Sequence, residues 1–206
     1  MIRWVAMAAL AAATLSRESS RSAKEKLERI ETLQVPPGQS VVLTEEEINS
    51  YLRYDFASSA PAGITELTFQ LQPDRVIGKA IVDFVEWQAA RGERPGALLA
   101  WLLRGKRRVE VVCRYISANG QGQADIESVL IGGVPVSAAA VEFLIEQVVE
   151  PRYPDAVVGR PAELGYGLRQ VKIERGKAVV TAGGPPVRAA QGALARRRPT
   201  VPKGRC

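Results

Sequence analysis

The residue types that most often carry out catalysis are scarce in this sequence. None of its 206 residues is histidine, so the commonest general base and metal ligand is missing. A Ser/His/Asp triad is therefore excluded. The two cysteines, Cys113 and Cys206, form neither a zinc-binding pattern nor a CxxC redox motif. We expect no catalytic residue, no metal site and no cofactor.

Glycine pairs and acidic clusters do not change this expectation. The Gly-x-Gly pairs at 120–122 and 165–167 lie between predicted strands, and neither completes the GxGxxG pattern of dinucleotide-binding proteins. The glutamates of 142–150 recur at i,i+4 spacing, which is typical of a solvated helix face. A carboxylate pair for glycoside hydrolysis is not excluded by the sequence, but nothing points to one. The sequence predicts that the protein is not an enzyme.

A different chemistry is indicated by residues 96–108, GALLAWLLRGKRR. An apolar run is followed at once by cations, a pattern that suits a membrane interface or the mouth of a lipid site. Burial of the run in the core is the alternative that the sequence leaves open. The predicted lipid or membrane contacts in this run are Leu98, Leu99, Trp101, Leu102 and Leu103, and the predicted headgroup contacts are Arg104, Lys106, Arg107 and Arg108.

A predicted strand over 76–88 is apolar on both faces. Trp87 lies on one side with Ile81 and Val85, and Val82 and Phe84 lie on the other. One face can pack on a helix, but the other must meet a second layer, a subunit or a ligand. We therefore add Val82, Phe84 and Trp87 to the predicted ligand-binding residues.

The two ends of the chain differ from its middle. Arg3 precedes the apolar run of 4–13, which has the form of a secretory signal and is shorter than the roughly 20 residues that span a bilayer. An uncleaved anchor is the alternative. Residues 188–206 contain six cations and no acid and are expected to be disordered. We predict a signal or anchor segment (1–15), a single domain (16–187) and a basic tail (188–206), in an extracytoplasmic protein (periplasmic or secreted) that is either free or membrane-associated.

The elements of the predicted domain alternate between helices and hairpins. Capping boxes at Ser22 and Thr44 predict two helix starts, and Asn119-Gly120 predicts a tight hairpin. The expected elements are helices at 23–33, 45–56 and 137–150, a strand at 40–43, and hairpins at 66–88, 108–131 and 168–181. This order indicates an α+β fold with a curved, twisted antiparallel meander sheet wrapped on a helix.

Three stretches resemble those of a known family. LTEEEINSYLRYDF (43–56), ESVLIGGVPVSAAAVEFLIEQ (127–147) and LRQVKIERGKAVVTA (168–182) are similar to the opening helix, the strand–turn–helix and the closing hairpin of YpmS-like and LmeA-like extracytoplasmic proteins. These are similar in turn to tubular lipid-binding domains, in which a curved sheet wraps a helix and leaves an apolar channel. The resemblance covers residues 41–182. It implies a lipid or another hydrophobic ligand and supplies no catalytic residue.

We therefore expect an exported, non-catalytic protein that binds a lipid or another hydrophobic ligand and acts in envelope lipid binding or transport. A membrane surface is a further expected partner. The alternative is a structural or interaction module whose apolar sheet face is buried in a homodimer or against an envelope partner. Nucleic-acid binding is not expected, because the basic tail has no aromatic residue to stack on bases.

Overall fold

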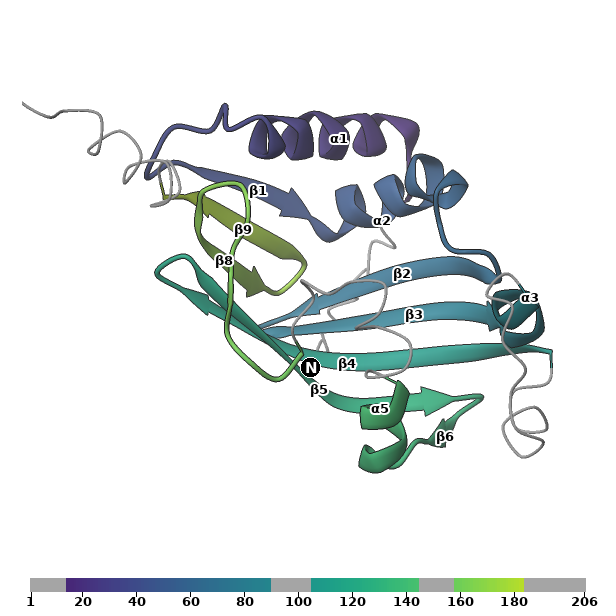
Figure 1. Ribbon diagram of the computed structural model, residues 1–206. Coiled ribbons are helices and arrows are strands. Elements are labelled where there is room, and N and C mark those ends of the chain that lie inside the picture. The colour runs from purple at the N-terminus through teal and green to yellow at the C-terminus, as the bar shows by residue number, and fades with distance from the viewer. Residues whose placement is uncertain (1–13, 90–104, 145–157, 184–206) are drawn as a thin grey trace, which may run out of the picture.

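Two antiparallel sheets and four α-helices make up the parts of the chain that the computed structural model describes, which are residues 14–89, 105–144 and 158–183 (Figure 1). The helices are α1 (Arg17–Glu31), α2 (Glu45–Tyr54), α3 (Phe84–Ala89) and α5 (Ala138–Leu144), with the 3₁₀ helix η1 (Phe56–Ser58). The strands are β1 (Ser40–Thr44), β2 (Ile64–Gln72), β3 (Arg75–Asp83), β4 (Lys106–Ala118), β5 (Gln121–Ile131), β6 (Val134–Pro135), β7 (Ala162–Glu163), β8 (Leu168–Glu174) and β9 (Lys177–Ala182). The predicted α+β fold with a curved antiparallel meander sheet is confirmed, and the sheet is open.

The larger sheet is a meander in the order β2-β3-β4-β5-β6, and β7 also pairs with β5. Asn119 and Gly120 form the β4–β5 turn with φ angles of 53° and 80°, as a tight two-residue hairpin requires. The predicted Asn-Gly hairpin is therefore confirmed. The predicted closing hairpin is also present, as β8 and β9, but it pairs with β1 in a separate sheet of order β1-β9-β8.

Helix α2 covers the free edge of the larger sheet through side-chain hydrogen bonds to β2. Asn49 Nδ2 donates to Phe69 O at 2.7 Å, and Asn49 Oδ1 accepts from Phe69 N at 2.7 Å. The Glu45 carboxylate accepts from Leu71 N at 2.7 Å. These bonds satisfy backbone groups that an exposed edge strand would offer to another chain. The helix is thereby fixed beside β2.

The helix starts show one confirmed prediction and one wrong one. The capping box of Thr44 is present at the start of α2. The predicted capping box at Ser22 is wrong, because α1 already begins at Arg17, where the Ser16 hydroxyl accepts from Ser19 N at 3.0 Å. Ser22 lies inside the helix, and its hydroxyl donates to Glu47 Oε1 at 2.6 Å.

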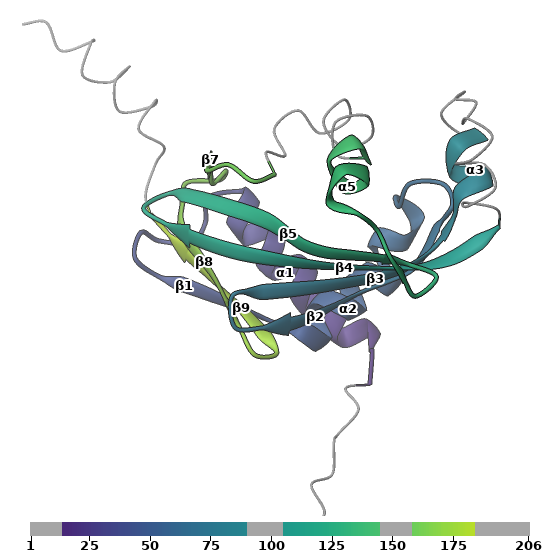
Figure 2. The ribbon, with the colours of Figure 1, turned by 90° about the horizontal axis from the view of Figure 1, so that it is seen from below.

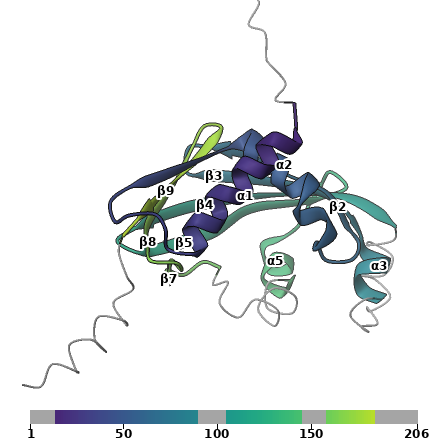
Figure 3. The same cartoon turned by 90° about the horizontal axis from the view of Figure 1, so that it is seen from above.

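Small residues let α1 and α2 approach closely. Ser20 and Ala23 on α1 are 1 % exposed, and Ser50 on α2 is completely buried. Ser16 N donates to the Ser50 hydroxyl at 3.2 Å, so the buried serine is paired. The two helices lie together at the β2 side of the larger sheet, as the views from the front and from above agree (Figures 1 and 3).

The predicted strand over 76–88 is wrong beyond Asp83. Asp83 Oδ1 accepts the backbone N–H groups of Val85 and Glu86, each at 3.1 Å, and such a side chain favours a helix start over continued strand. Phe84 therefore opens α3, and Trp87 lies in that helix instead of on a strand. The first half of the helix predicted at 137–150 is present as α5, which begins at Ala138. Residues 145–150 lie outside the described residues. Both α3 and α5 project from the same side of the larger sheet (Figure 2).

Three apolar clusters hold the elements together. The first lies between α1 and the smaller sheet and includes Ala23, Ile30, Val41, Leu43 and Val180. The second joins the two sheets through Leu71, Ile173 and Ala178. The third, around Val82 and Phe84, lies where α3 leaves β3.

Candidate functional site

An open groove of about 640 Å³ lies between the α2–η1 segment and the strands β2, β3 and β4. We call this space the groove. Its roof is apolar and is formed mainly by Leu15, Leu52, Phe56, Ala57 and Ala60, and its floor is mixed and includes Ile64, Thr68, Lys79, Ile81, Arg108 and Glu110. One wall therefore suits a hydrocarbon chain, and the other offers polar and charged groups.

The sequence of α2 explains why this helix serves both the core and the groove. Ile48 and Tyr51 pack against the buried cluster beside β1. Leu52 and Phe56 lie further round the helix axis, and both line the groove. Gly63, with a φ angle of 80°, turns the chain from η1 into β2, so the roof lies directly over the strand that follows it.

Charges of both signs line the groove, with cations in excess. Lys79 Nζ lies 3.4 Å from Glu110 Oε2, and these two charges largely neutralise each other. Glu66 adds a second acid, and Arg53 and Arg108 add two cations. Within the described parts of the chain, neither arginine makes an ion pair. An anion in the groove would therefore meet two guanidinium groups without a carboxylate partner.

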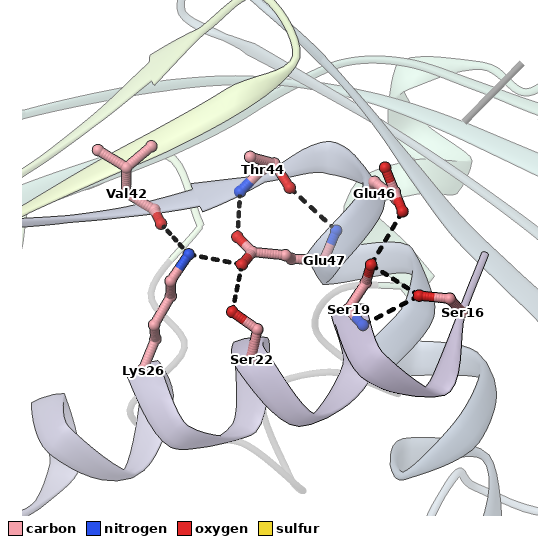
Figure 4. A network of polar contacts seen from close by, with 8 residues as sticks. All are labelled: Ser16, Ser19, Ser22, Lys26, Val42, Thr44, Glu46 and Glu47. Carbon is pink, nitrogen blue, oxygen red and sulfur yellow. Dashed lines mark hydrogen bonds and ion pairs between the residues drawn. The ribbon is translucent and has the colours of Figure 1, made fainter. Parts of the chain in front are cut away.

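A polar network fixes the helix that carries the roof (Figure 4). Glu47 on α2 accepts from Lys26 Nζ at 2.5 Å and from the Ser22 hydroxyl at 2.6 Å, both on α1. Its second oxygen accepts from Thr44 N at 2.9 Å. Lys26 Nζ also donates to Val42 O at 2.8 Å. One buried carboxylate thus ties α1, β1 and α2 into a single support.

Burial of Glu47 would by itself raise the pKa of its carboxyl group. Hydrogen bonds from Lys26, Ser22 and the Thr44 backbone outweigh that effect and hold the pKa below its usual value. The carboxylate is therefore charged in the folded protein at neutral pH. Because all of its partners are structural, we assign it to support and not to chemistry.

The predicted headgroup cations divide between two faces of β4. Arg107 pairs with Val82 and Arg108 with Ile81, and neighbouring residues on a strand point to opposite faces. Of the predicted cations, Arg108 lines the groove. Lys106 and Arg107 are also exposed, and Arg104 lies outside the described residues. Membrane contact by these cations stays a prediction.

The three predicted apolar contacts that the structure describes, Val82, Phe84 and Trp87, do not line the groove. Val82 and Phe84 are 8 % and 7 % exposed, in a cluster that borders the groove through Ile64 and Ala80. Trp87 lies in α3. The remaining predicted contacts, Leu98, Leu99, Trp101, Leu102 and Leu103, lie outside the described residues. Ligand contact at these eight positions stays a prediction.

Sequence reasoning missed the groove, although it found part of its roof. The periodicity of 45–56 predicted that Leu52 and Phe56 share the apolar face of one helix, which is correct for Leu52, whereas α2 ends at Tyr54 and Phe56 lies in η1. The periodicity contained no signal to separate them from the core residues Ile48 and Tyr51. Leu15 was assigned to the signal or anchor segment, yet it lines the groove, and its carbonyl accepts from Tyr54 Oη at 3.4 Å.

The described residues offer little for covalent or metal chemistry. Among them, no group of three or more cysteine, aspartate or glutamate side chains is arranged to hold a metal ion. Burial, together with the charges of Asp125 and Glu127, raises the pKa of the Cys113 thiol, and a protonated thiol is a poor nucleophile. No helix among the described residues is long and apolar enough to cross a membrane.

The fold and the groove define an α+β protein with an open, partly apolar groove beside its larger sheet. No protein-family model, curated protein or solved structure matches the chain. A functional assignment must therefore rest on the groove itself.

Proposed function

We propose that this protein binds a lipid, or another hydrophobic ligand with an anionic end, in the groove and acts without catalysis in envelope lipid binding or transport. The observation that carries the proposal is the pairing of a mainly apolar roof with two arginines, Arg53 on α2 and Arg108 on the floor, that make no ion pair among the described residues. The volume of about 640 Å³ lies within the range of roughly 300–1,000 Å³ that is usual for small-molecule sites.

Each wall has a separate role in this proposal. Leu52, Phe56 and the two alanines would contact the hydrocarbon chain and remove its apolar surface from water. Arg108 on β4, with Arg53 on α2, would face a carboxylate or phosphate. The Lys79–Glu110 pair also lines the groove and can donate hydrogen bonds to a polar linker or accept them from it. The groove is open, so a ligand can enter without unfolding of α2.

A tryptophan at position 57 should block the groove. Ala57 is exposed on η1 and lines the roof, so Ala57→Trp would place an indole where the chain is proposed to lie. After lipid removal, the full-length wild type should bind the fluorescent fatty acid cis-parinaric acid saturably. Ala57→Trp should weaken this binding about tenfold or more, which corresponds to about 1.4 kcal/mol.

The matched control is Ala118→Trp, at an exposed position at the end of β4 outside the groove, which should bind like wild type. Equal binding by Ala57→Trp and wild type would place the ligand elsewhere. A wild type that binds no probe and forms a stable dimer in light scattering would favour the interaction module instead.

The anionic end of the ligand is tested separately at Arg108. Arg108→Gln should weaken binding of the fatty acid about fivefold to tenfold, since one charge-assisted contact is lost. It should leave binding of the uncharged methyl ester unchanged, as measured by competition with cis-parinaric acid. Lys106→Gln, two residues away and absent from the groove lining, is the control. An equal loss for acid and ester would contradict a role in recognising charge.

A further inference from the structure

A second, basic pocket of about 250 Å³ lies at the corner where α1 begins and α2 ends. Arg17, Arg21 and Lys24 recur at i, i+4 and i+7 on α1 and therefore share one face of the helix. All three are exposed and line the pocket together with Tyr54 and Asp55. The residues come from two elements that the Glu47 network holds in a fixed relation, so the cluster is preformed.

The acid within this pocket already has partners. Asp55 accepts a short hydrogen bond from the buried Ser20 hydroxyl, and its other oxygen lies 3.8 Å from Lys24 Nζ. Within the described residues, Arg17 and Arg21 make no ion pair. The pocket therefore has a net positive charge that its own carboxylate does not cancel.

The ring of Tyr54 brings Arg53 close to Arg17, because both guanidinium groups lie near it. The Arg17 guanidinium carbon lies 5.2 Å from the centre of the Tyr54 ring, and that of Arg53 lies 5.9 Å from it. We call Arg17, Arg21, Lys24 and Arg53 the basic corner. Two acids on α1 neighbour this stripe, Glu25 at i+4 from Arg21 and Glu28 at i+4 from Lys24, and neither makes an ion pair with these cations among the described residues.

The basic corner lies beside the groove. Arg53 lines the groove, whereas the next two residues, Tyr54 and Asp55, line the basic pocket. Leu15 in the groove roof is two residues from Arg17, and its carbonyl accepts the Tyr54 hydroxyl. The apolar roof of the groove and the cations of the basic corner are therefore adjacent.

We propose that the basic corner is a docking surface for the face of a bilayer that contains anionic phospholipids. Several cations on one rigid surface match the negative potential of such a bilayer, and their exposed guanidinium groups suit phosphate oxygens. Docking there would bring the groove to the membrane. The inference does not require the groove to bind lipid. Arg53 lies at the border of both sites, but the other residues of the basic corner lie outside the groove.

The test compares two full-length variants that lose the same charge. Arg17→Gln/Arg21→Gln/Lys24→Gln removes three cations of the corner and keeps good helix formers. The control, Arg160→Gln/Arg169→Gln/Arg175→Gln, removes three exposed cations outside both pockets. Binding is measured by co-sedimentation with phosphatidylcholine vesicles that contain or lack phosphatidylglycerol.

The corner variant should lose on the order of 100-fold in partitioning to phosphatidylglycerol vesicles, about fivefold for each cation. The control variant should stay close to wild type. Binding of the wild type should also fall steeply when salt rises from about 0.1 M to about 1 M, because the Debye length shrinks from about 10 Å to about 3 Å. Thermal melts of both variants should match the wild type.

Three results would overturn the proposal. An equal loss in both variants would show that net charge, not this corner, attracts the protein. Equal binding to vesicles with and without phosphatidylglycerol would show that anionic lipid is not recognised. Displacement by inorganic phosphate well beyond that by sodium chloride of equal ionic strength would identify a site for free phosphate. Ala57→Trp, which blocks the groove, should keep vesicle binding, so failure of the proposed lipid function is distinguishable from failure of docking.

Discussion

Leu71→Ala should lower the free energy of unfolding by about 3 kcal/mol, within the range of about 2–5 kcal/mol for truncating a buried leucine. Leu71 is 4 % exposed and packs on Ile173 and Ala178 of the smaller sheet. It is the buried side chain that the larger sheet contributes to that cluster, and Val76 and Tyr115 of the same sheet pack against it while partly buried. Truncation leaves a cavity between two sheets whose backbones are also joined here, since Gly176 N donates to Leu71 O at 3.0 Å. This hydrogen bond limits how far the two sheets can move toward each other to fill the cavity.

Chemical denaturation provides the measurement. The denaturant concentration at the unfolding midpoint should fall. The slope of the unfolding free energy against denaturant concentration should stay the same, because the substitution changes packing and not the surface area exposed on unfolding. Ile116→Ala is the matched control, since Ile116 on β4 is 41 % exposed and should cost less than about 1 kcal/mol. Similar losses for the two variants would show that Leu71 does not join the sheets as described.

Signals confined to a few neighbouring residues predicted most of the fold. The Thr44 capping box and the Asn119-Gly120 turn are each determined by a short stretch of chain, and both are present. The Ser22 box has the same local form, but the helix already begins at Arg17, where the Ser16 hydroxyl accepts from Ser19 N, and Ser22 lies inside it. A local pattern fails where an earlier serine caps the same helix, because the pattern does not indicate which of the two is used.

The end of β3 is determined by a single polar side chain and not by the alternation of apolar residues. The apolar residues from Val76 to Trp87 fit a strand, but Asp83 accepts two backbone N–H groups and begins α3. An apolar run of this length does not by itself distinguish a continuing strand from a strand followed by a short helix. The side-chain cap decides between them, and its geometry is visible only in the structure.

The groove was not predictable because its walls are far apart in the sequence. Leu15, Phe56 and Arg108 meet only after the β2–β3–β4 register is set. That register contains an irregularity between Thr65 and Thr68, which changes the residues that face the roof. Periodicity can assign a residue to a face of its own element, but it cannot identify what lies opposite.

Glu47→Gln should lower the free energy of unfolding by about 2–3 kcal/mol at neutral pH, because it removes the charge that Lys26, Ser22 and Thr44 surround. The Glu47 side chain is 11 % exposed and that of Lys26 is 28 % exposed, so solvent screens the pair less than it screens a surface pair. Truncation of either partner should leave the other partly buried and without its counter-charge.

A double-mutant cycle of Lys26→Met and Glu47→Gln should give a coupling energy of about 1–2 kcal/mol. The control cycle uses Lys79→Met and Glu110→Gln, whose side chains are 45 % and 34 % exposed and whose charged atoms lie 3.4 Å apart. Its coupling should stay below about 1 kcal/mol, as is usual for exposed pairs. A coupling between Lys26 and Glu47 no larger than that of the control pair would contradict a stabilising role of this ion pair between α1 and α2.

The pH dependence provides a second measure of Glu47. Its pKa in the folded protein lies below the ordinary value of 4.5, so the unfolded chain takes up a proton first as the pH falls. The advantage of wild type over Glu47→Gln should therefore be complete above about pH 5 and should diminish as the pH falls through 4.5 toward the folded pKa.

Two other carboxylates among the described residues have lowered pKa values in the folded protein. Hydrogen bonds from Arg75 and from Lys172 hold the pKa values of Glu127 and Glu174 below their usual range. Both remain in wild type and variant, so the difference between the two unfolding curves isolates Glu47. A difference that stayed constant from about pH 7 to about pH 3 would show that this carboxylate stabilises the α1–α2 contact through its shape and not through its charge.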